Sequence, residues 1–299
     1  MDKKLNIIIS GGGTGGHLIP AFAIADAFLS NDPDVEIVFL GSKKGIESKL
    51  YKQRNEKHYL LKTVGLNREI SIKSIYHNLI VFPYSFIHAM FKTFKIFRKF
   101  NPDIVIGTGG YSSAIPLFVA YLKGVKIFIQ EQNSVPGLVN KIFLRKANMA
   151  FFGIEPKYSN NIKYMVSGNP TKSRFNKSKI SSHRNKKLFT ILIIGGSQGS
   201  VPINNHFLKN YKKYLENWND VRLIWQCGEK NIDIIKDKVK SEYIELHGFI
   251  NDIEKFYLIS DLIISRSGAL TLTEISNYEK ASILIPFPYA ANNHQLFNA

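Results

Sequence analysis

The chain has 299 residues, of which 44% are hydrophobic and 12% aromatic, enough to form two compact domains and to exclude a wholly disordered protein. Its single cysteine, Cys227, excludes an internal disulfide and a metal site built from several cysteines, and we expect it to be a small buried residue. The formal net charge of +17 predicts attraction to anionic partners such as nucleic acid, anionic lipid or phosphorylated substrates.

A glycine-rich turn follows the first predicted strand, Leu5–Ile9, which begins too early to leave room for a signal peptide. The turn, GGGTGGH at 11–17, precedes apolar residues with helical spacing across Ala21–Leu29, and N–H groups at such a helix start attract anions. The turn matches the G-x-G-x-x-G dinucleotide pattern. However, the second predicted strand ends in Gly41-Ser42-Lys43 without the acidic residue that holds a ribose, which disfavours NAD.

The first half of the chain alternates short β-branched runs with helical stretches. This rhythm predicts a parallel sheet with helices on both faces, in which ligands bind beyond the carboxyl ends of the strands. The predicted strands are Leu5–Ile9, Glu36–Leu40, Ile104–Ile106, Val125–Ile129, Met149–Phe152 and Tyr164–Val166.

The segment Ser71–Phe100 carries large apolar residues at helical spacing, flanked by lysines and arginine. Pro83 should kink the segment or divide it into two helices. The apolar stripe is either an ordinary core-facing surface or a patch rimmed by cations that docks on anionic lipid. Its most lipid-like part, Leu79–Ile87, is far shorter than the roughly 20 residues that a bilayer-spanning helix needs.

Two further loops come directly after predicted strands, GTGGYSS at 107–113 and QEQN at 130–133. Both therefore open on the same edge of the sheet as the first glycine turn. Small residues let a ligand approach the backbone, and the amides and the carboxylate can bind sugar hydroxyls, although ordinary turns would look the same.

A stretch rich in Ser, Asn and basic residues, 172–187, predicts a linker between domains 1–171 and 188–299. After it the opening pattern returns, with the strand Phe189–Ile194 followed by GGSQGS at 195–200 and a helix, which predicts a second anion-binding turn. The remaining predicted strands of this α/β domain are Val221–Trp225, Tyr243–Leu246, Leu262–Ile264 and Ser282–Ile285.

The stretch SRSGALTLTE at 265–274 turns from strand to helix and places Glu274 in the first helical turns. Its carboxylate either satisfies the helix dipole or accepts two hydrogen bonds from a ribose diol. A polar cluster, NNHQ at 292–295, begins the last predicted helix.

Eight motifs occur in the order typical of one enzyme family: GGGTGGH (11–17), GTGGY (107–111), EQN (131–133), GNP (168–170), GGSQGS (195–200), GFI (248–250), SRSGALTLTE (265–274) and NNHQLFNA (292–299). Over essentially its whole length the sequence resembles the MurG family, the peptidoglycan N-acetylglucosaminyltransferases of glycosyltransferase family 28. The resemblance implies the GT-B architecture, two Rossmann-like α/β domains with parallel sheets facing a cleft. Since family members continue past the last motif, it also implies a second domain that is truncated at its C-terminal end.

The activity implied is the inverting transfer of N-acetylglucosamine from UDP-N-acetylglucosamine to the 4-hydroxyl of the muramoyl sugar of undecaprenyl-pyrophosphoryl-MurNAc-pentapeptide. We therefore expect these two substrates and an anionic membrane surface as partners, no nucleic acid, no cofactor and no metal. The expected location is the cytoplasmic face of the cell membrane, as a peripheral protein.

His17 is the first candidate for the general base, because it ends the first glycine turn and an imidazole titrates near neutral pH. Glu131 is the alternative base, since a carboxylate in a closing cleft can have its pKa raised; otherwise it orients its loop. Lys172 stands where the family has an arginine, which keeps the charge but loses the bidentate fork.

The resemblance places the donor sugar on Asn133 and Gln295, the diphosphate on the amides around Ser197, uracil on the Ile250 backbone and the ribose diol on Glu274. The predicted substrate-binding residues are Thr14, Gly15, Gly16, Asn133, Lys172, Ser197, Gln198, Ile250, Ala269, Leu270, Thr271, Leu272, Thr273, Glu274 and Gln295.

Three alternatives remain open. A related enzyme with another lipid acceptor would share the nucleotide-binding half, a non-hydrolysing UDP-N-acetylglucosamine epimerase would share the architecture, and a non-catalytic remnant would bind partners without turnover.

Overall fold

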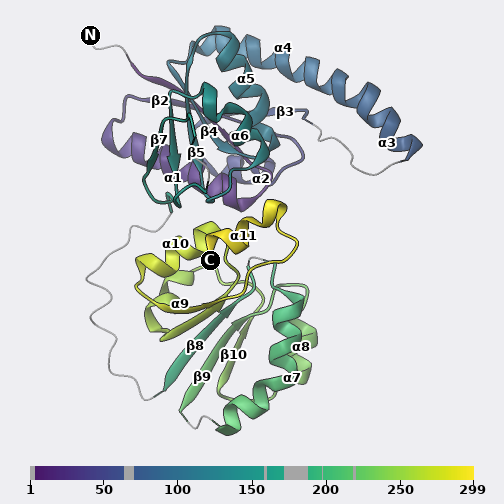
Figure 1. The fold of residues 1–299 in the computed structure, drawn as a ribbon, viewed down its shortest axis with the longest axis vertical. Coiled ribbons are helices and arrows are strands. Elements are labelled where there is room, and N and C mark those ends of the chain that lie inside the picture. The colour runs from purple at the N-terminus through teal and green to yellow at the C-terminus, as the bar shows by residue number, and fades with distance from the viewer. Residues whose placement is uncertain (1–3, 64–70, 158–159, 172–187, 197, 218–219) are drawn as a thin grey trace. The chain divides into compact units, whose positions relative to one another are not determined.

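The computed structural model describes residues 4–63, 71–157, 160–171, 188–196, 198–217 and 220–299. The chain divides into two compact units, residues 1–172 and 173–299. Each unit contains a parallel β-sheet with helices on both of its faces (Figure 1). The predicted linker, 172–187, lies outside the described residues.

Within the described part of the first unit, seven parallel strands form one sheet in the order β3-β2-β1-β4-β5-β6-β7. The strands are β1 (Asn6–Gly11), β2 (Glu36–Ser42), β3 (Lys57–Leu61), β4 (Ile104–Gly109), β5 (Lys126–Glu131), β6 (Met149–Phe152) and β7 (Tyr164–Val166). The helices are α1 (Gly15–Asn31), α2 (Glu47–Leu50), α3 (Ile72–Tyr76), α4 (Phe82–Phe100), α5 (Ala114–Leu122) and α6 (Leu138–Phe143). This strand order is that of a Rossmann-like domain, as predicted.

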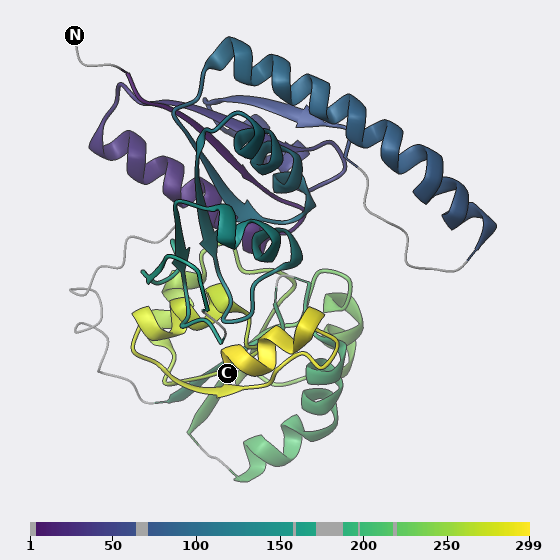
Figure 2. The same cartoon turned by 45° about the horizontal axis from the view of Figure 1, so that its top comes forward.

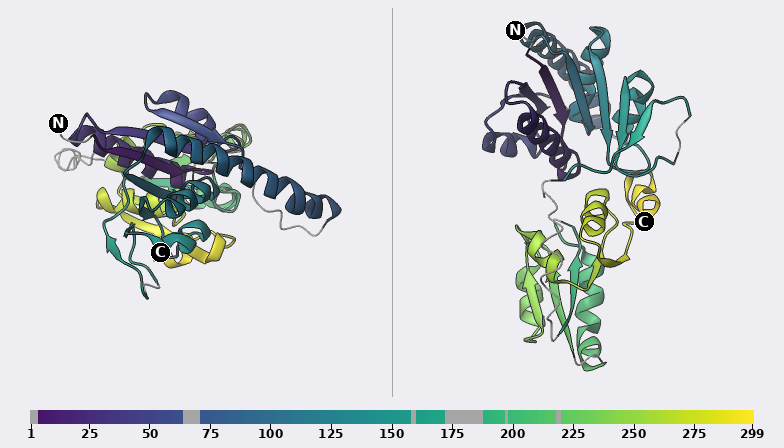
Figure 3. Two further views of the ribbon diagram at one scale, coloured as in Figure 1. Left: turned by 90° about the horizontal axis from the view of Figure 1, so that it is seen from above. Right: turned by 90° about the vertical axis from the view of Figure 1, so that its left-hand side faces the viewer.

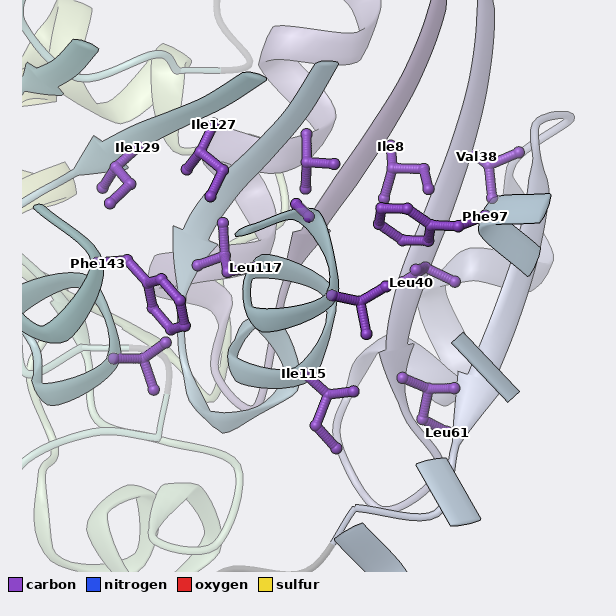
Figure 4. Close-up of a cluster of buried hydrophobic side chains, with 14 of the residues drawn as sticks. Ile8, Val38, Leu40, Leu61, Phe97, Ile115, Leu117, Ile127, Ile129 and Phe143 are labelled. Atoms are coloured by element: carbon purple, nitrogen blue, oxygen red, sulfur yellow. The ribbon is translucent and has the colours of Figure 1, made fainter. Parts of the chain in front are cut away.

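Alternate residues of each strand form the two cores of the first unit. On β1, Ile8 faces a cluster with α4, α5 and α6 that includes Phe97 and Leu117 (Figure 4). Its neighbours Ile7 and Ile9 face the opposite cluster, which α1 covers. Burial on both faces explains why these strands read as continuous apolar runs rather than as alternating patterns.

The strand β3 was missed from the sequence. It reads Lys-His-Tyr-Leu-Leu and pairs with β2 at the edge of the sheet, where only Leu61 is fully buried. A mixed, half-exposed edge strand lacks the β-branched run by which its neighbours were identified.

The prediction that Pro83 divides the segment after Ser71 is wrong. Helix α3, a π-helical stretch at His77–Val81 and α4 follow one another without a break, and Figure 2 shows one long helix. Pro83 is the second residue of α4 and closely follows the π-helical stretch, so its missing N–H falls where the regular hydrogen-bond pattern already changes. The outer end of this helix projects beyond the sheet (Figure 3).

Within the described part of the second unit, five parallel strands are ordered β10-β9-β8-β11-β12. The strands are β8 (Phe189–Ile194), β9 (Val221–Gln226), β10 (Ile244–His247), β11 (Leu262–Ser265) and β12 (Ala281–Leu284). One core lies under α7 (Val201–Asn217) and α8 (Ile232–Lys238), and the other under α9 (Ile253–Ile259) and α10 (Ala269–Asn277), as the right panel of Figure 3 shows. A short helix, α11 (His294–Asn298), ends the chain.

Candidate active site

The first glycine turn packs against the loop that follows β4. The Gly12 N–H donates to the Gly109 carbonyl at 3.3 Å. Gly110 has φ +80°, and a Cβ on it would lie 2.2 Å from the Gly12 oxygen. A side chain at Gly109 would meet the His17 ring at 2.8 Å. Gly109 and Gly110 are therefore required by their close approach to the first glycine turn and to the histidine.

His17 lies half-buried at the start of α1, with Nδ1 3.1 Å from the Gly12 carbonyl oxygen and 3.2 Å from the Thr14 hydroxyl. A carbonyl only accepts hydrogen bonds, so this contact favours the tautomer in which Nδ1 carries the proton and Nε2 is the basic nitrogen of the neutral ring. The helix begins directly after Thr14, and the first N–H groups of a helix, here those of Gly15 and Gly16, have no partner within the helix. This arrangement suits both a base and an anion.

Glu131, the alternative base, is only 2% exposed. One carboxylate oxygen accepts from the Asn133 N–H and side-chain amide at 3.1 Å each, and the other from the Gly137 N–H at 3.0 Å and the Asn140 amide at 2.9 Å. These four bonds occupy the carboxylate and fix the loop that carries Asn133.

Sequence reasoning missed Asn140, which lies on α6 and is 1% exposed. Its amide also donates to the Gln130 carbonyl at 3.2 Å, and it would be 3.4 Å from a Cβ on Gly109. Asn140 therefore fixes the Glu131 carboxylate and the end of β5, and lies close to the loop after β4. An asparagine seven residues beyond a motif carries no local signal of such a role.

The second glycine turn follows β8. Gly196 and Gly199 have φ of +92° and +76°, and a Cβ on Gly199 would lie 2.0 Å from the carbonyl oxygen of Cys227, which is fully buried as expected. Gln198 is exposed at the tip of the turn. Ser197 and Lys172 lie outside the described residues, so their predicted contacts remain predictions.

Arg266 was not singled out from the sequence, although it stands inside a quoted motif. Its guanidinium donates to the Ser200 hydroxyl at 2.8 Å and to the carbonyls of Ile285 and Pro286 at 3.1 and 3.0 Å. Burial lowers the pKa of Arg266. The cation holds the second glycine turn against the loop after β12.

Gln226, also missed, connects two predicted binding segments. Its amide nitrogen donates to the Gly196 carbonyl at 2.9 Å, and its amide oxygen accepts from the Ile250 N–H at 3.1 Å. The Ile250 N–H is therefore engaged within the protein, while Ile250 itself is placed beside the glycine turn.

Helix α10 carries the predicted segment Ala269–Glu274 at the carboxyl end of β11. Glu274 lies in its second turn, beyond the reach of the helix N-terminus, which disfavours the helix-dipole explanation. Its half-buried carboxylate accepts from the Tyr257 hydroxyl at 2.9 Å. Burial raises the pKa of Glu274, and the bond from Tyr257 opposes that shift.

Gln295 is the second residue of α11, and hydrogen bonds hold it at the carboxyl edge of the second sheet. Its side-chain oxygen accepts from the Phe287 N–H at 2.9 Å, and its carbonyl accepts from the Ser267 hydroxyl at 2.7 Å. In each unit, the described predicted residues therefore gather at the carboxyl ends of the strands, as the fold predicts.

Comparison with known protein families finds a match for each of the two units. Residues 7–152 match the glycosyltransferase family 28 N-terminal domain, and residues 190–299 match the family 28 C-terminal domain.

Individual relatives agree with these matches. The UDP-N-acetylglucosamine--N-acetylmuramyl-(pentapeptide) pyrophosphoryl-undecaprenol N-acetylglucosamine transferase of Syntrophus aciditrophicus is 37% identical over 99% of this chain and 81% of its own length. The transferase of the same name from Flavobacterium psychrophilum is 35% identical over 99% and 82%. The crystal structure of Acinetobacter baumannii MurG is 26% identical, with a TM-score of 0.75 over 98% of this chain and 82% of that one.

Proposed function

The chain belongs to glycosyltransferase family 28, and we propose that it transfers N-acetylglucosamine from UDP-N-acetylglucosamine to the 4-hydroxyl of undecaprenyl-pyrophosphoryl-MurNAc-pentapeptide. The observation that carries the proposal is the identity of 37% and 35%, over 99% of the chain, to two transferases named for this reaction. The predicted residues at the carboxyl edges of both sheets support it.

In the proposed reaction, the oxygen of the acceptor 4-hydroxyl forms a bond to the anomeric carbon of the donor sugar, while the bond from that carbon to the diphosphate breaks. UDP leaves with the bonding electrons, and inversion gives a β linkage. The hydroxyl proton passes to Nε2 of His17, the basic nitrogen when Nδ1–H bonds Gly12. Glu131 acts as a positioning residue for Asn133, because its carboxylate is already occupied.

We assign the donor nucleotide to the second unit. The N–H groups of the second glycine turn would meet the diphosphate, and positive charge from Arg266 close behind that turn would stabilise the departing UDP. Glu274 would accept hydrogen bonds from the ribose diol, and Gln295 would meet the sugar. Lys172 and Ser197 keep their predicted roles toward the donor.

A transfer assay with labelled UDP-N-acetylglucosamine and a short-chain analogue of the lipid-linked acceptor tests the proposal. We expect the label in a lipid-linked disaccharide and none in a diacylglycerol acceptor. His17→Ala should lose turnover while still binding UDP-N-acetylglucosamine in calorimetry. Label on diacylglycerol alone would favour the related lipid glycosyltransferases, conversion of the free nucleotide sugar would favour an epimerase, and donor binding without turnover would favour a non-catalytic protein.

We further propose that the α3–α4 helix docks on an anionic membrane surface. One side of it is buried in the first unit through Ala89, Ile96 and Phe97. The other exposes large apolar side chains, with Leu79 and Tyr84 each 72% and Phe91 66% exposed. Exposed basic residues accompany them, namely Lys73, Lys95, Arg98 and Lys99. None of the helices in the described part of the chain combines the length and apolar character that crossing a bilayer requires.

Sedimentation with vesicles tests this docking. We expect the protein to sediment with vesicles that contain phosphatidylglycerol, and less so in high salt. Leu79→Ser with Phe91→Ser should reduce sedimentation without lowering stability, whereas the control Ile234→Ser, at a residue 56% exposed in the second unit, should not. Equal sedimentation of all three proteins would rule out this helix as the docking surface.

A further inference from the structure

Glu47 is a fully buried carboxylate that the reaction described above does not use. It is the first residue of α2 and is 0% exposed. Its Oε1 accepts from the Ser42 N–H and its Oε2 from the Gly13 N–H, both at 2.9 Å. Among the described residues no lysine, arginine or histidine forms an ion pair with it, so backbone N–H groups of two loops hold its charge.

The surrounding chain leaves room for this carboxylate. A Cβ on Gly12 would lie 2.4 Å, on Gly41 2.6 Å and on Gly45 2.0 Å from atoms of the Glu47 side chain. One acidic residue therefore occupies the space beside three glycines, one in the first glycine turn, one in β2 and one in the loop after β2. A charge so far from water is costly unless it is well hydrogen-bonded, and a neutral side chain would avoid that cost.

One peptide group connects Glu47 to His17. The Gly13 N–H that donates to Glu47 and the Gly12 carbonyl that accepts from His17 Nδ1 at 3.1 Å belong to the same peptide unit. Resonance in the peptide links its nitrogen to its oxygen. An anion that accepts from the N–H therefore increases the negative charge on the oxygen, and hydrogen bonds in such a chain strengthen one another.

We propose that Glu47 is a positioning residue for His17, acting through the Gly12–Gly13 peptide. It keeps the proton of the neutral ring on Nδ1, and it stabilises the imidazolium that forms when Nε2 accepts the acceptor's proton. The arrangement serves the purpose of a carboxylate that orients a catalytic histidine, with a peptide group between the two. The inference rests on the proposed function, in which His17 is the base.

Other titratable groups lie near this turn. Tyr51 places its hydroxyl 3.4 Å from the Gly11 carbonyl oxygen, and burial together with the charge of Glu47 raises the pKa of Tyr51 above its usual range. Glu131 is bonded by Asn140, whose amide lies near Gly109 on the facing loop, and Tyr111 follows Gly110 on that loop. None of the three is substituted in the variants below, although Glu47→Gln also removes one cause of the raised Tyr51 pKa.

The pH dependence of kcat in the transfer assay tests the inference. His17 must be deprotonated to act, so kcat rises with pH through the pKa of the imidazole. Removing the negative charge in Glu47→Gln disfavours the imidazolium, and the acid limb should move to lower pH while the plateau falls about tenfold. The KM for UDP-N-acetylglucosamine should not change. Glu47→Asp keeps the charge and should leave the limb closer to its wild-type position.

Glu56→Gln is the matched control, because Glu56 is also a largely buried carboxylate but pairs with Arg54 beside the amino end of β3. Its profile should match the wild type. An acid limb that stays in place in Glu47→Gln, or a change in KM alone, would overturn the inference.

A measurement on the wild-type chain needs no variant to fold. Nitrogen-15 chemical shifts of His17 in the wild-type chain should show the Nδ1–H tautomer. Where Glu47→Gln folds, its imidazole should lose the proton at lower pH than in the wild type, and in Glu47→Asp at a pH closer to the wild type. The Nε2–H tautomer would overturn the inference. If the wild-type protein transfers no sugar, the proposed function fails, while the tautomer and the titration still decide whether Glu47 acts on His17.

Discussion

Glu131 and Glu274 are both carboxylates in predicted binding motifs, but their hydrogen bonds separate their roles. Glu131 is 2% exposed and accepts four hydrogen bonds from its own loop and from α6. Glu274 is half-buried and accepts from Tyr257, with its pKa raised by burial. A carboxylate whose oxygens all accept hydrogen bonds within the protein holds the local structure in place. A carboxylate with remaining acceptor capacity can bind a ligand, but its charge is poorly compensated until the ligand binds.

The first prediction concerns Asn140→Ala. This change removes a donor from the buried Glu131 carboxylate and should destabilise the first unit by about 1–3 kcal/mol, the usual cost of a buried polar group that loses its partner. Urea unfolding measures it. Asn31→Ala is the control, because Asn31 is exposed and bonds only the Ala27 carbonyl at the end of α1; it should stay within about 0.5 kcal/mol. Equal effects would contradict the role given to Asn140.

The second prediction concerns Glu274 and pH. Its pKa is raised above the ordinary value of 4.5, so the folded state binds more protons than the unfolded chain between the two pKa values. The contribution of Glu274 to stability is therefore present below pH 4.5 and is lost as pH rises through the raised pKa. Urea unfolding of wild type and Glu274→Gln should show the wild-type free energy of unfolding falling more steeply across this window. Parallel pH profiles would contradict the prediction.

The residues that hold the site together could not be predicted from the sequence, because their partners lie far along the chain. Arg266 bonds Ser200 across 66 positions, and Gln226 bonds Gly196 across 30. Glu47 stands in an ordinary surface-like stretch, Lys43-Lys44-Gly45-Ile46-Glu47, with nothing to indicate its complete burial. By contrast, His17 and Glu274 belong to glycine-containing turns after strands, a local pattern with a known chemical use.

At the scale of elements, each glycine turn lies in close backbone contact with a neighbouring loop. At each turn, a glycine with positive φ lies against a carbonyl across the loop contact. In the first unit Gly110, in the loop after β4, meets the Gly12 carbonyl of the turn; in the second Gly199, in the turn itself, meets the Cys227 carbonyl. The contact leaves no space for a Cβ. Adjacent loops of each sheet edge are thus pressed together, which places backbone N–H groups and site side chains in a small region.

The third prediction compares two glycines. Gly110→Ala introduces a side chain at φ +80° that would lie 2.2 Å from the Gly12 oxygen. Gly124→Ala, at φ +65°, meets nothing within 4 Å. Both should incur a backbone cost for a positive φ, of about 1–3 kcal/mol, and Gly110 at ψ 162° lies in a region that is essentially confined to glycine. Only Gly110→Ala adds a steric clash. It should unfold at lower urea concentration than Gly124→Ala and should lower kcat, because displacing Gly12 breaks its contact with His17.

Burial does not decide which strand bounds were predicted correctly, since Tyr164–Val166 is half-buried to exposed along its length. The strands Met149–Phe152, Tyr164–Val166 and Phe189–Ile194 have the predicted bounds, and most others extend by one to three residues at their carboxyl ends. These extensions are glycines and polar residues such as Gly109 and Glu131, which continue the ladder without an apolar signal. The continuous helix through Pro83 was not predicted, because the π-helical stretch that precedes the proline has no sequence signature here.

At the scale of the whole molecule, the two units share one fold but carry different functional side chains. The first carries the histidine and the exposed apolar helix, and the second carries the buried arginine and the half-buried carboxylate. This division supports the proposal that the first unit meets the lipid-linked acceptor at the membrane and the second meets the nucleotide. The formal charge of +17 suits both an anionic surface and anionic substrates.

The fourth prediction tests this division by hydrogen exchange with UDP. At about 100 times its Kd, UDP should stabilise its site by about 2.7 kcal/mol. Protection should appear in peptides that cover Gly195–Ser200 and Ser265–Glu274, and not in peptides that cover Gly11–His17. Phosphate buffer without nucleotide is the control for a general effect of anions. Protection of the first glycine turn alone would reverse the assignment of the two units.

Gln226 links the second glycine turn to the segment at Ile250 in the second unit. Because one amide holds both the glycine turn and the segment at Ile250, those two segments cannot shift independently. If the base binds at Ile250 and the phosphates at the glycine turn, as predicted, this link would fix the distance between the two binding places before the nucleotide arrives. The second unit would then select nucleotides by the distance between base and phosphates as well as by the base. Gln226→Ala would reduce this selectivity more than it reduces the affinity for UDP.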